Sequence, residues 1–294
     1  MEFRGSIVAM ITPFTEEGKI DRAGVERLIN FHIENGTDAI LLAGTTGESA
    51  TLTHDEHKEL IKMGVEIANG RIPIVAGTGS NSTAEALELT KCAKEAGADA
   101  ALLITPYYNK PTQKGMYLHF KKIAEEVDIP IILYNVPSRT GINLLPDTVA
   151  KLSEIPNIVA VKEASGNLGQ MVQIVRGVKP GFKLMSGDDQ LLLPILSIGG
   201  TGVISVVANI IPRDMAQMIK EWEAGNVEKA REMYLKMYPL AQAMFYETNP
   251  IPVKTAAGLL GLPTGPLRLP LAPMDDANLE KMKKAMRDYG LEVN

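Results

Sequence analysis

Short apolar runs recur along the chain at nearly regular intervals. The runs begin at Ser6, Ala39, Ile72, Ala100, Pro130, Ile158, Lys183 and Gly202. Successive starts are separated by 33, 33, 28, 30, 28, 25 and 19 residues. Each run is apolar at both alternating sets of positions, which is typical of parallel strands buried on both faces. Each interval is long enough for one helix with its turns, so the pattern predicts alternating strands and helices.

The segment 82–97 shows the helical pattern expected between two of these runs. Its small and apolar residues recur at helical spacing, its charged residues lie elsewhere, and Gly97 supplies a stop. Eight strand–helix units predict a (β/α)8 barrel, the TIM barrel. A doubly wound open sheet is the competing architecture, but the candidate dinucleotide signature at 77–82 lacks its third glycine.

The strand rhythm ends after Val206, and the remaining sequence has helical patterns. Three segments carry them, namely 228–245, 250–261 and 275–290. The sequence therefore predicts a catalytic barrel over residues 1–224 and a C-terminal helical domain over residues 225–294.

Composition narrows the classes of function. The chain has 294 residues, 45% hydrophobic, and its 30 Lys and Arg against 35 Asp and Glu give a net charge of −5. No Lys/Arg-rich run offers a surface for nucleic acid.

The single cysteine, Cys92, cannot form an intrachain disulfide, and the N-terminus lacks the features of a signal peptide. Glycines and a proline interrupt the uncharged stretch 191–212, which favours a buried helix and strand over a membrane span. We therefore expect a cytoplasmic protein with no nucleic-acid or membrane partner.

Polar residues that follow the strands are the candidates for chemistry, because such barrels place their active sites at the carboxyl ends of the strands. Lys162 ends one run, and desolvation in a barrel mouth lowers the pKa of an amine, so that it can attack a ketone and form an imine. The alternatives are an ion pair with Glu163 or an amine at the solvated rim.

Tyr134 ends the preceding run, about 4.8 Å away across the sheet, where its phenol suits a proton shuttle. The alternative is an aromatic ring filling the barrel with its hydroxyl in water.

Four other features allow both a functional and an ordinary interpretation. Thr45 and Thr46 stand between glycines, as in a loop that presents hydroxyls or in a plain turn. The glycines at 199–202 resemble a phosphate site, but no lysine or arginine lies nearby, so close backbone packing is favoured. His54 and His57 lack the spacing and the third ligand of a zinc site, so we expect solvated histidines in a first helical turn. An arginine in a Pro/Ser/Gly loop, as at Arg139, is usually a solvated charge.

Six motifs spread over most of the chain carry a resemblance to one family. In chain order they are GTTGESATLTHDEH, PYYNKPTQ, YNVPSRTG, AVKEASG, GDD and NPIPVK. Each motif alone is weak, but the ordered set covers both the predicted barrel and the helical tail. On these motifs the chain resembles the dihydrodipicolinate synthase (4-hydroxy-tetrahydrodipicolinate synthase) family of Schiff-base pyruvate lyases and aldolases.

The resemblance implies a lyase of lysine and diaminopimelate biosynthesis that condenses pyruvate with (S)-aspartate 4-semialdehyde through an imine on Lys162. It implies a proton relay of Tyr134, Thr45 and Tyr108, in which Tyr108 reaches the active site of a neighbouring subunit. Arg139 matches the position that receives the carboxylate of the aldehyde. The positions that face pyruvate and its intermediates are Thr46, Gly187 and Ile204. No metal or organic cofactor is expected, because the imine is the electron sink. The family expectation is a homotetramer, a dimer of dimers.

The resemblance also implies feedback inhibition by L-lysine. The matching residues are Ser49, Ala50, His54, His57, Asn81, Glu85 and Tyr107. A carboxylate at Glu85 suits an ammonium group, while Asn81 and Tyr107 can donate to a carboxylate. Two other functions stay open: a sialic acid or 2-keto-3-deoxy sugar acid lyase with the same imine chemistry, and a catalytically silent protein that binds a keto acid. Arg139 and the two adjacent tyrosines argue against the sugar acids, and the retained lysine, tyrosine and threonine set argues against a silent protein.

Overall fold

The computed structural model describes residues 3–293. Residues 1, 2 and 294, at the outer ends of the two predicted domains, lie outside the described residues. Within the described chain, strands β1 to β8 follow one another in chain order around a closed barrel. Each of the eight apolar runs contains one of these strands, as the described residues show. The predicted (β/α)8 barrel, with helical segments after it, is confirmed.

The chain forms two compact units. One consists of residues 73–204 with residues 3 and 4, and the other of residues 5–72 and 205–293. The domain boundary predicted at residue 224 stays a prediction. The compactness of a unit does not show that this part of the chain folds independently.

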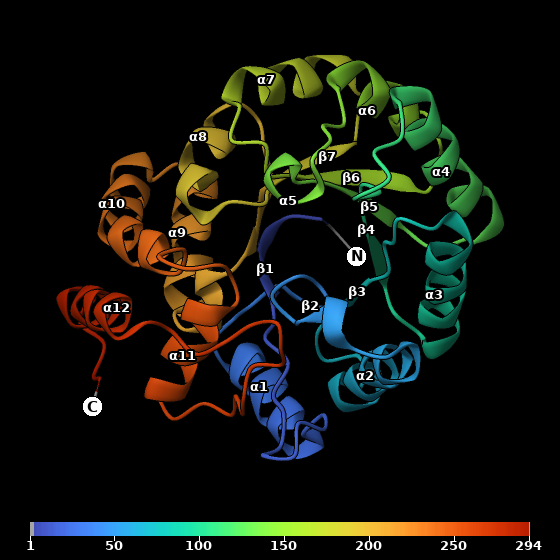
Figure 1. The fold of residues 1–294 in the computed structure, drawn as a ribbon. Coiled ribbons are helices and arrows are strands. Elements are labelled where there is room, and N and C mark those ends of the chain that lie inside the picture. Colours follow the sequence, from blue (N-terminus) through green and yellow to red (C-terminus); the bar gives the residue numbers. More distant parts are fainter. Residues whose placement is uncertain (1–2, 294) are drawn as a thin grey trace. The chain divides into compact units, whose positions relative to one another are not determined.

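The first unit alternates strands with helices. Its strands are β3 (Ile74–Gly77), β4 (Ala100–Ile104), β5 (Ile131–Asn135), β6 (Ile158–Glu163), β7 (Lys183–Ser186) and β8 (Gly202–Ser205), the last of which ends in the other unit. Its helices are α3 (Thr83–Ala96), α4 (Gln113–Glu126), α5 (Pro137–Thr140), α6 (Pro146–Ser153), α7 (Leu168–Gly177), the 3-10 turn η2 (Asp189–Leu191) and α8 (Leu192–Ser197). In Figure 1, α3, α4, α6 and α7 lie along one side of these strands.

Apolar side chains on the helices and strands of this unit explain why they pack. Phe120 and Ile123 of α4 lie in one buried cluster with Leu103 of β4 and Leu133 of β5. The predicted helix at 82–97 is confirmed as α3. Its first turn is capped by Ser82, whose side chain accepts from the Glu85 N–H, and Gly97 ends it at φ 90°, a left-handed conformation that favours glycine.

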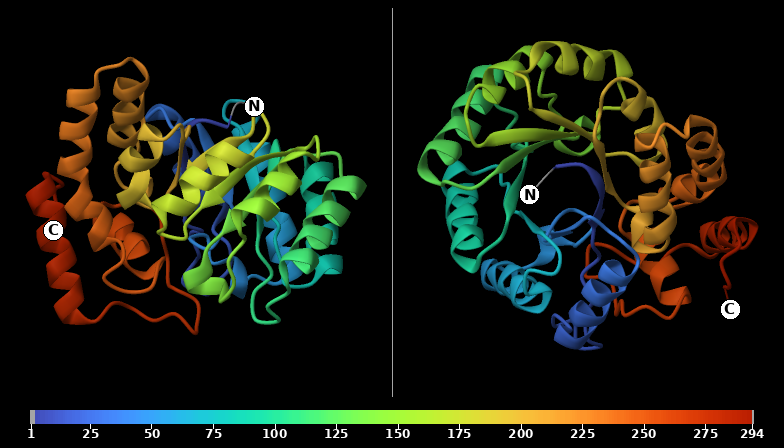
Figure 2. Two further views of the ribbon diagram at one scale, coloured as in Figure 1. Left: turned by 90° about the horizontal axis from the view of Figure 1, so that it is seen from above. Right: turned by 180° about the vertical axis from the view of Figure 1, so that it is seen from behind.

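The second unit holds the remaining strands and the C-terminal helices. Its elements are β1 (Gly5–Ala9), α1 (Arg22–Glu34), β2 (Ala39–Leu42), the 3-10 turn η1 (Ser49–Thr51), α2 (His54–Ala68), the 3-10 turn η3 (Val207–Asn209), α9 (Pro212–Glu223), α10 (Val227–Ala243), α11 (Ile251–Leu259) and α12 (Asp276–Tyr289). Strands β1 and β2 pair in parallel. Helix α10 packs against α9 and α12, as Figure 2 shows. Helices α10, α11 and α12 confirm the three helical segments predicted in the tail.

The uncharged stretch 191–212 contains α8, β8 and η3. Three of the six residues of α8 are buried, and β8 and η3 are buried throughout, so the expected helix followed by a buried strand is observed. From residue 3 to residue 293, no helix is both long and apolar enough to cross a membrane.

Candidate active site

Lys162 is the centre of the candidate site. It lies near the carboxyl end of β6 and is only 5% exposed. Its Nζ lies 4.2 Å from the centre of the Tyr134 ring. Burial lowers the pKa of Lys162 to about 7; the charge of Asp189 partly opposes this change and that of Arg139 adds to it. An amine with this pKa is substantially neutral near neutral pH, so it can act as a nucleophile.

Glu163 does not form the ion pair with Lys162 that the sequence left open. Neighbouring residues in a strand point to opposite faces, and the Glu163 carboxylate accepts hydrogen bonds from Asn135, Ser165 and Gln170. The other alternative, an amine at the solvated rim, is also wrong, because Lys162 is buried.

Tyr134 is the direct neighbour of Lys162. The register of the parallel pair β5–β6 sets Tyr134 opposite Lys162 and Asn135 opposite Glu163. The tyrosine is 6% exposed, so its ring fills the space beside Lys162, and the predicted adjacency of the two side chains is confirmed.

The other predicted substrate-binding residues of this unit surround the same strand ends. Arg139 is exposed on the short helix α5, which begins two residues after β5. Gly187 follows β7, and a Cβ at this position would lie 3.2 Å from Cε of Lys162 and 2.8 Å from Cβ of Ala164. Glycine therefore leaves room beside the amine. Ile204 is fully buried in β8.

Thr45 and Thr46 belong to the other compact unit, in the loop after β2. The Thr46 hydroxyl is buried and accepts a hydrogen bond of 3.0 Å from Asn249 Nδ2, while Thr45 is half-buried. Glu48, in the same loop, has a left-handed φ of 56°. Its carboxylate forms a buried ion pair of 2.6 Å with Lys254 of α11. The loop is therefore attached at two points to the segment that contains the NPIPVK motif.

Tyr107 and Tyr108 lie in the loop between β4 and α4. Tyr108 is 88% exposed and Tyr107 is 39% exposed, and Tyr108 has a left-handed φ of 67°. A tyrosine rarely takes this conformation without a requirement on where its side chain points.

The residues predicted for L-lysine fall into two groups. Asn81, Glu85 and Tyr107 belong to the unit of Lys162, and Ser49, Ala50, His54 and His57 belong to the unit of Thr45. In the first group, the carbonyl of Asn81 accepts from Asn109 Nδ2 at 2.9 Å, and Glu85 accepts from the Ser80 hydroxyl. In the second group, the expectation of two solvated histidines holds for His54 but is wrong for His57, which is buried.

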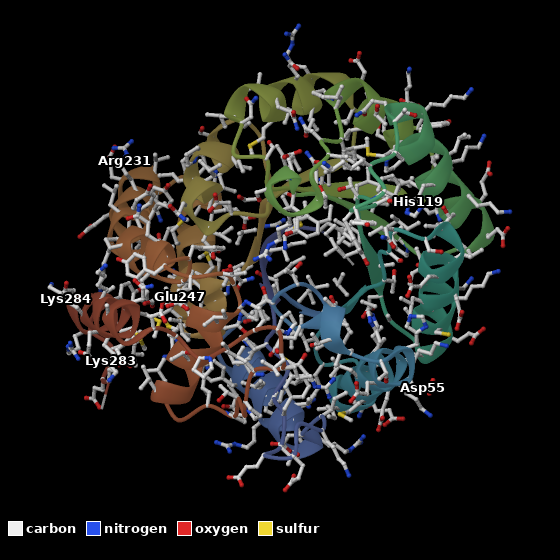
Figure 3. All side chains as sticks on the ribbon, viewed as in Figure 1. Asp55, His119, Arg231, Glu247, Lys283 and Lys284 are labelled. Carbon is white, nitrogen blue, oxygen red and sulfur yellow. The ribbon has the colours of Figure 1, made fainter. Side chains whose placement is uncertain are left out.

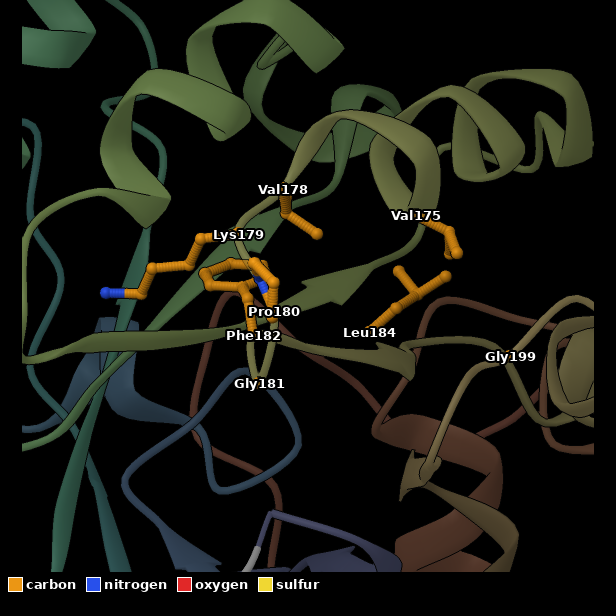
Figure 4. A pocket seen from close by; sticks show the side chains of 8 residues that line it. All are labelled: Val175, Val178, Lys179, Pro180, Gly181, Phe182, Leu184 and Gly199. Atoms are coloured by element: carbon orange, nitrogen blue, oxygen red, sulfur yellow. The ribbon is translucent and has the colours of Figure 1, made fainter.

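A separate cavity lies before β7 and β8, at the amino ends of the strands. Its volume is about 310 Å³. Its lining residues are Val175, Val178, Lys179, Pro180, Gly181, Phe182, Leu184 and Gly199. Figure 4 shows the Lys179 side chain directed away from the others, and its Nζ donates to the Ile155 carbonyl. In a barrel of this kind, residues at the amino ends of the strands serve stability rather than catalysis.

The glycines before β8 were predicted to serve close packing. A Cβ at Gly200 would lie 2.3 Å from Ile195, so close packing explains this glycine.

Sequence reasoning missed the polar residues behind the site. Asn135 and Gln170 donate to the Glu163 carboxylate, Asn143 bonds to both of these amides, and Asp189 is a buried charge near Lys162. The available signal was strand parity, since Asn135 and Glu163 directly follow Tyr134 and Lys162 and must point the other way.

Sequence comparison relates the chain to one family along almost its whole length. The model of the Dihydrodipicolinate synthetase family matches residues 2–289. A protein of Syntrophus aciditrophicus named 4-hydroxy-tetrahydrodipicolinate synthase is 55% identical, over 98% of this chain and 99% of its own. A protein of Persephonella marina with the same name is also 55% identical, over 98% of this chain and 99% of its own.

Solved structures show the same relationship. Dihydrodipicolinate synthase from Aquifex aeolicus is 50% identical, with a TM-score of 0.97 over 99% of this chain and 100% of that one. The enzyme from Cyanidioschyzon merolae with lysine bound is 46% identical, with a TM-score of 0.96 over 99% and 100% of the two chains. The chloride-inhibited enzyme from Acinetobacter baumannii complexed with pyruvate is 46% identical, with a TM-score of 0.96 over 98% and 99%.

Proposed function

Because the chain belongs to the dihydrodipicolinate synthetase family, we propose that it condenses pyruvate with (S)-aspartate 4-semialdehyde to give 4-hydroxy-tetrahydrodipicolinate. This is a lyase step of lysine and diaminopimelate biosynthesis. The observation that carries the proposal is Lys162, a buried amine whose pKa burial lowers to about 7. The names of the relatives and the pyruvate complex of the Acinetobacter baumannii enzyme support it.

The proposed reaction begins with imine formation. The neutral Nζ of Lys162 adds to the keto carbon of pyruvate, and loss of water leaves an imine. A proton then leaves the adjacent methyl group, and the enamine that results attacks the aldehyde carbon. The aldehyde oxygen takes up a proton and becomes a hydroxyl. The amine of the second substrate finally displaces Lys162 from the imine carbon, which closes the ring and frees the enzyme. The imine serves as the electron sink, so these reaction steps need no metal or organic cofactor.

Each step moves a proton, and the relay of Tyr134, Thr45 and Tyr108 is proposed to carry it. Tyr134 has the best support, because its ring contacts the Lys162 amine. Positioned acid–base groups of this kind contribute about 10²–10⁴-fold to a rate. The exposure of Tyr108 supports a role outside its own subunit. We therefore propose a homotetramer, a dimer of dimers, in which Tyr108 serves a neighbouring site.

The proposed substrate contacts use the charge of one side chain and groups of the backbone near Lys162. The guanidinium of Arg139 offers a planar fork that suits the carboxylate of the aldehyde. Thr46 and the backbone at Gly187 and Ile204 are proposed to face pyruvate and its intermediates. The space beside Lys162 that Gly187 leaves open supports this assignment.

We also propose that L-lysine inhibits the enzyme at the seven residues named for it, and that the protein works in the cytoplasm. The lysine-bound structure of the Cyanidioschyzon merolae enzyme supports the first proposal. The bond from Asn109 to Asn81 supplies a physical link, because Asn109 follows the two tyrosines directly.

One experiment tests the proposed reaction. Borohydride is added to the enzyme with pyruvate, and the modified peptide is identified by mass spectrometry. We expect a pyruvate-derived mass on Lys162 and loss of activity. Lys162→Arg should give no adduct, because a guanidinium stays protonated and offers no neutral nucleophile. Turnover is then compared between aspartate semialdehyde, N-acetylneuraminate and a keto-deoxy sugar acid. Labelling of another lysine, or turnover of the sugar acids alone, would contradict the proposal.

A further inference from the structure

A closed network of polar side chains, three buried and one half-buried, lies behind the strand ends that carry Lys162 and Tyr134. Asn135 and Glu163 stand opposite each other in the β5–β6 register, one position after that pair. Both are 0% exposed. Asn135 Nδ2 lies 3.1 and 3.2 Å from the two Glu163 oxygens, and the Ser165 N–H donates to Glu163 at 2.7 Å. Two catalytic strands and the loop after β6 are thus tied to one carboxylate.

The same asparagine closes the loop that carries Arg139. Its Oδ1 accepts from the Leu144 N–H at 2.9 Å, and its Nδ2 donates to Asn143 Oδ1 at 2.8 Å. The loop of residues 136–143 therefore begins directly after Asn135 in the chain, and its far end is bonded back to the Asn135 side chain. Inside the loop, the Thr140 hydroxyl lies within hydrogen-bond distance of the carbonyls of Val136 and Ile142.

A second pair of amides connects this loop back to Glu163. Asn143 Nδ2 donates to Gln170 Oε1 at 2.7 Å, and Gln170 Nε2 donates to Asn143 Oδ1 at 3.1 Å. Gln170 Nε2 also lies 3.4 Å from Glu163 Oε2. Burying a carboxylate is costly unless donors surround it, and these bonds satisfy it without a cation. Burial still raises the pKa of Glu163, against the effect of these bonds.

We propose that Glu163, Asn135, Asn143 and Gln170 form a positioning network that holds the Arg139 loop in register with Lys162 and so determines which aldehyde is accepted. None of the four touches the reacting atoms, so each is a positioning residue. Arg139 itself is exposed on a helix of four residues, which cannot fix a guanidinium fork alone. The role of Arg139 toward the aldehyde carboxylate rests on the proposed function.

The variant Asn143→Ala tests the network, because it removes three of these bonds and keeps the backbone carbonyl that accepts from Gln113. We expect the KM for aspartate semialdehyde to rise about ten- to a hundredfold, since a misplacement of about 1 Å has effects of that size. The rate at which pyruvate is trapped on Lys162 should stay unchanged. Gln170→Met, at the edge of the network, gives the same test if Asn143→Ala does not fold.

Asn157→Ala is the matched control. Asn157 also bonds through its side-chain amide, to the carbonyls of Ala124 and Val127, but it lies just before β6, at the other end of the strand. We expect a lower Tm and an unchanged aldehyde KM.

A double-mutant cycle separates positioning from general damage. In an Arg139→Ala background, Asn143→Ala should no longer change the aldehyde KM, because both substitutions then remove the same interaction. Additive effects in the cycle, or an equal loss of pyruvate trapping, would overturn the network's role while the reaction itself stands. Failure of the wild-type enzyme to trap pyruvate on Lys162 would instead contradict the proposed function.

Discussion

At the scale of single residues, the basicity of Lys162 sets the pH dependence of imine formation. Only the neutral amine attacks pyruvate, and burial lowers its pKa to about 7. The rate of imine formation should therefore rise about tenfold per pH unit below about pH 7 and level off above it. Trapping with cyanoborohydride across about pH 5 to about pH 9, read by mass spectrometry, measures this profile. A rate still rising at the alkaline end, as for an exposed lysine, would contradict the desolvated amine.

Residue-scale chemistry was predictable only where strand parity decides it. Lys162 shares its side of the strand with Ile158 and Ala160, so its inward direction and lowered pKa followed from the sequence. Parity also sets Asn135 and Glu163 on the opposite side of the same pair of strands. The bonds of Glu163 to Ser165 and Gln170 did not follow, because they depend on the conformation of the loop and helix after β6.

At the scale of elements, a buried ion pair attaches α11 to the loop of Thr45 and Thr46. Lys254 Nζ lies 2.6 Å from Glu48 Oε1 and donates to the Pro266 carbonyl at 2.9 Å, and the Arg268 N–H donates to Glu48 at 3.0 Å. Removing one partner of such a pair leaves an uncompensated buried charge, which costs about 3–5 kcal/mol. We expect Lys254→Met to lower the free energy of unfolding by this amount in urea titrations at neutral pH.

The double variant Glu48→Gln/Lys254→Met should recover part of that loss, because no buried charge is left unpaired. The control is Lys284→Met, which breaks the exposed pair of Lys284 with Asp288 on α12 and should cost under about 1 kcal/mol. Figure 3 shows Lys284 at the outer side of that helix. Equal losses of unfolding free energy on replacing the buried and the exposed lysine would contradict this expected difference in cost.

Helices α3 and α4 are joined by a buried histidine that makes stability depend on pH. His119, labelled on α4 in Figure 3, has its Nδ1 2.9 Å from the Thr83 hydroxyl. Burial lowers the pKa of His119 to about 4, against about 6.5 in the unfolded chain. Between these values the unfolded state binds more protons, so stability falls as pH drops, by at most about 1.4 kcal/mol per unit.

We expect urea midpoints to show this fall from about pH 6.5 to about pH 4, with a shallower slope in His119→Asn, which keeps a polar group for Thr83. His32, whose pKa burial lowers to about 3, acts in the same direction and remains in both proteins. Parallel slopes in the two proteins would show that His119 does not contribute.

Element positions were largely predictable because a barrel repeats one simple pattern. All eight strands and the three tail helices fell on the predicted segments, within the residues that the structure describes. The short elements η1, α5 and η2 were not expected. They are too short to show a hydrophobic period, and they lie in the loops that carry site residues.

At the scale of the whole molecule, the proposed assembly makes an isolated subunit incomplete. Tyr108 is 88% exposed and has a left-handed backbone, which suits a side chain that serves a neighbour. Tyr108→Phe and Tyr134→Phe, each nearly inactive, should regain activity when their subunits exchange. With equal mixing about half of the dimers are hybrids with one complete site of two, which gives about a quarter of wild-type activity.

The control mixes Tyr134→Phe with Lys162→Arg, whose defects lie in the same subunit's own site, so no hybrid site is complete. Exchange is followed by mass spectrometry of the native assemblies. No recovery in the test mixture despite exchange would place Tyr108 in the site of its own chain. Recovery in the control mixture would contradict the assignment of Tyr134 and Lys162 to one subunit's site.

The proposed inhibition by L-lysine also belongs to the whole molecule, because it would join an effector site to the proposed catalytic relay. The carbonyl of Asn81 accepts from Asn109, whose own N–H donates to the Tyr107 carbonyl at 2.8 Å. We propose that a ligand held by Asn81 and Tyr107 orders the loop that presents Tyr108. Coupling through such a loop is worth about 1–3 kcal/mol, a change of about 5- to 150-fold in affinity.

Glu85→Ala removes the carboxylate that is proposed to bind the ammonium group of L-lysine. We expect millimolar or tighter lysine to inhibit the wild-type enzyme and to leave Glu85→Ala uninhibited, with pyruvate condensation largely intact. Glu88→Ala, an exposed glutamate three residues further along α3, is the matched control and should stay inhibited. Initial rates with and without lysine, together with calorimetry, measure both properties. Full wild-type activity at saturating lysine with no heat of binding would eliminate the effector site, while the chemistry at Lys162 would stand unchanged.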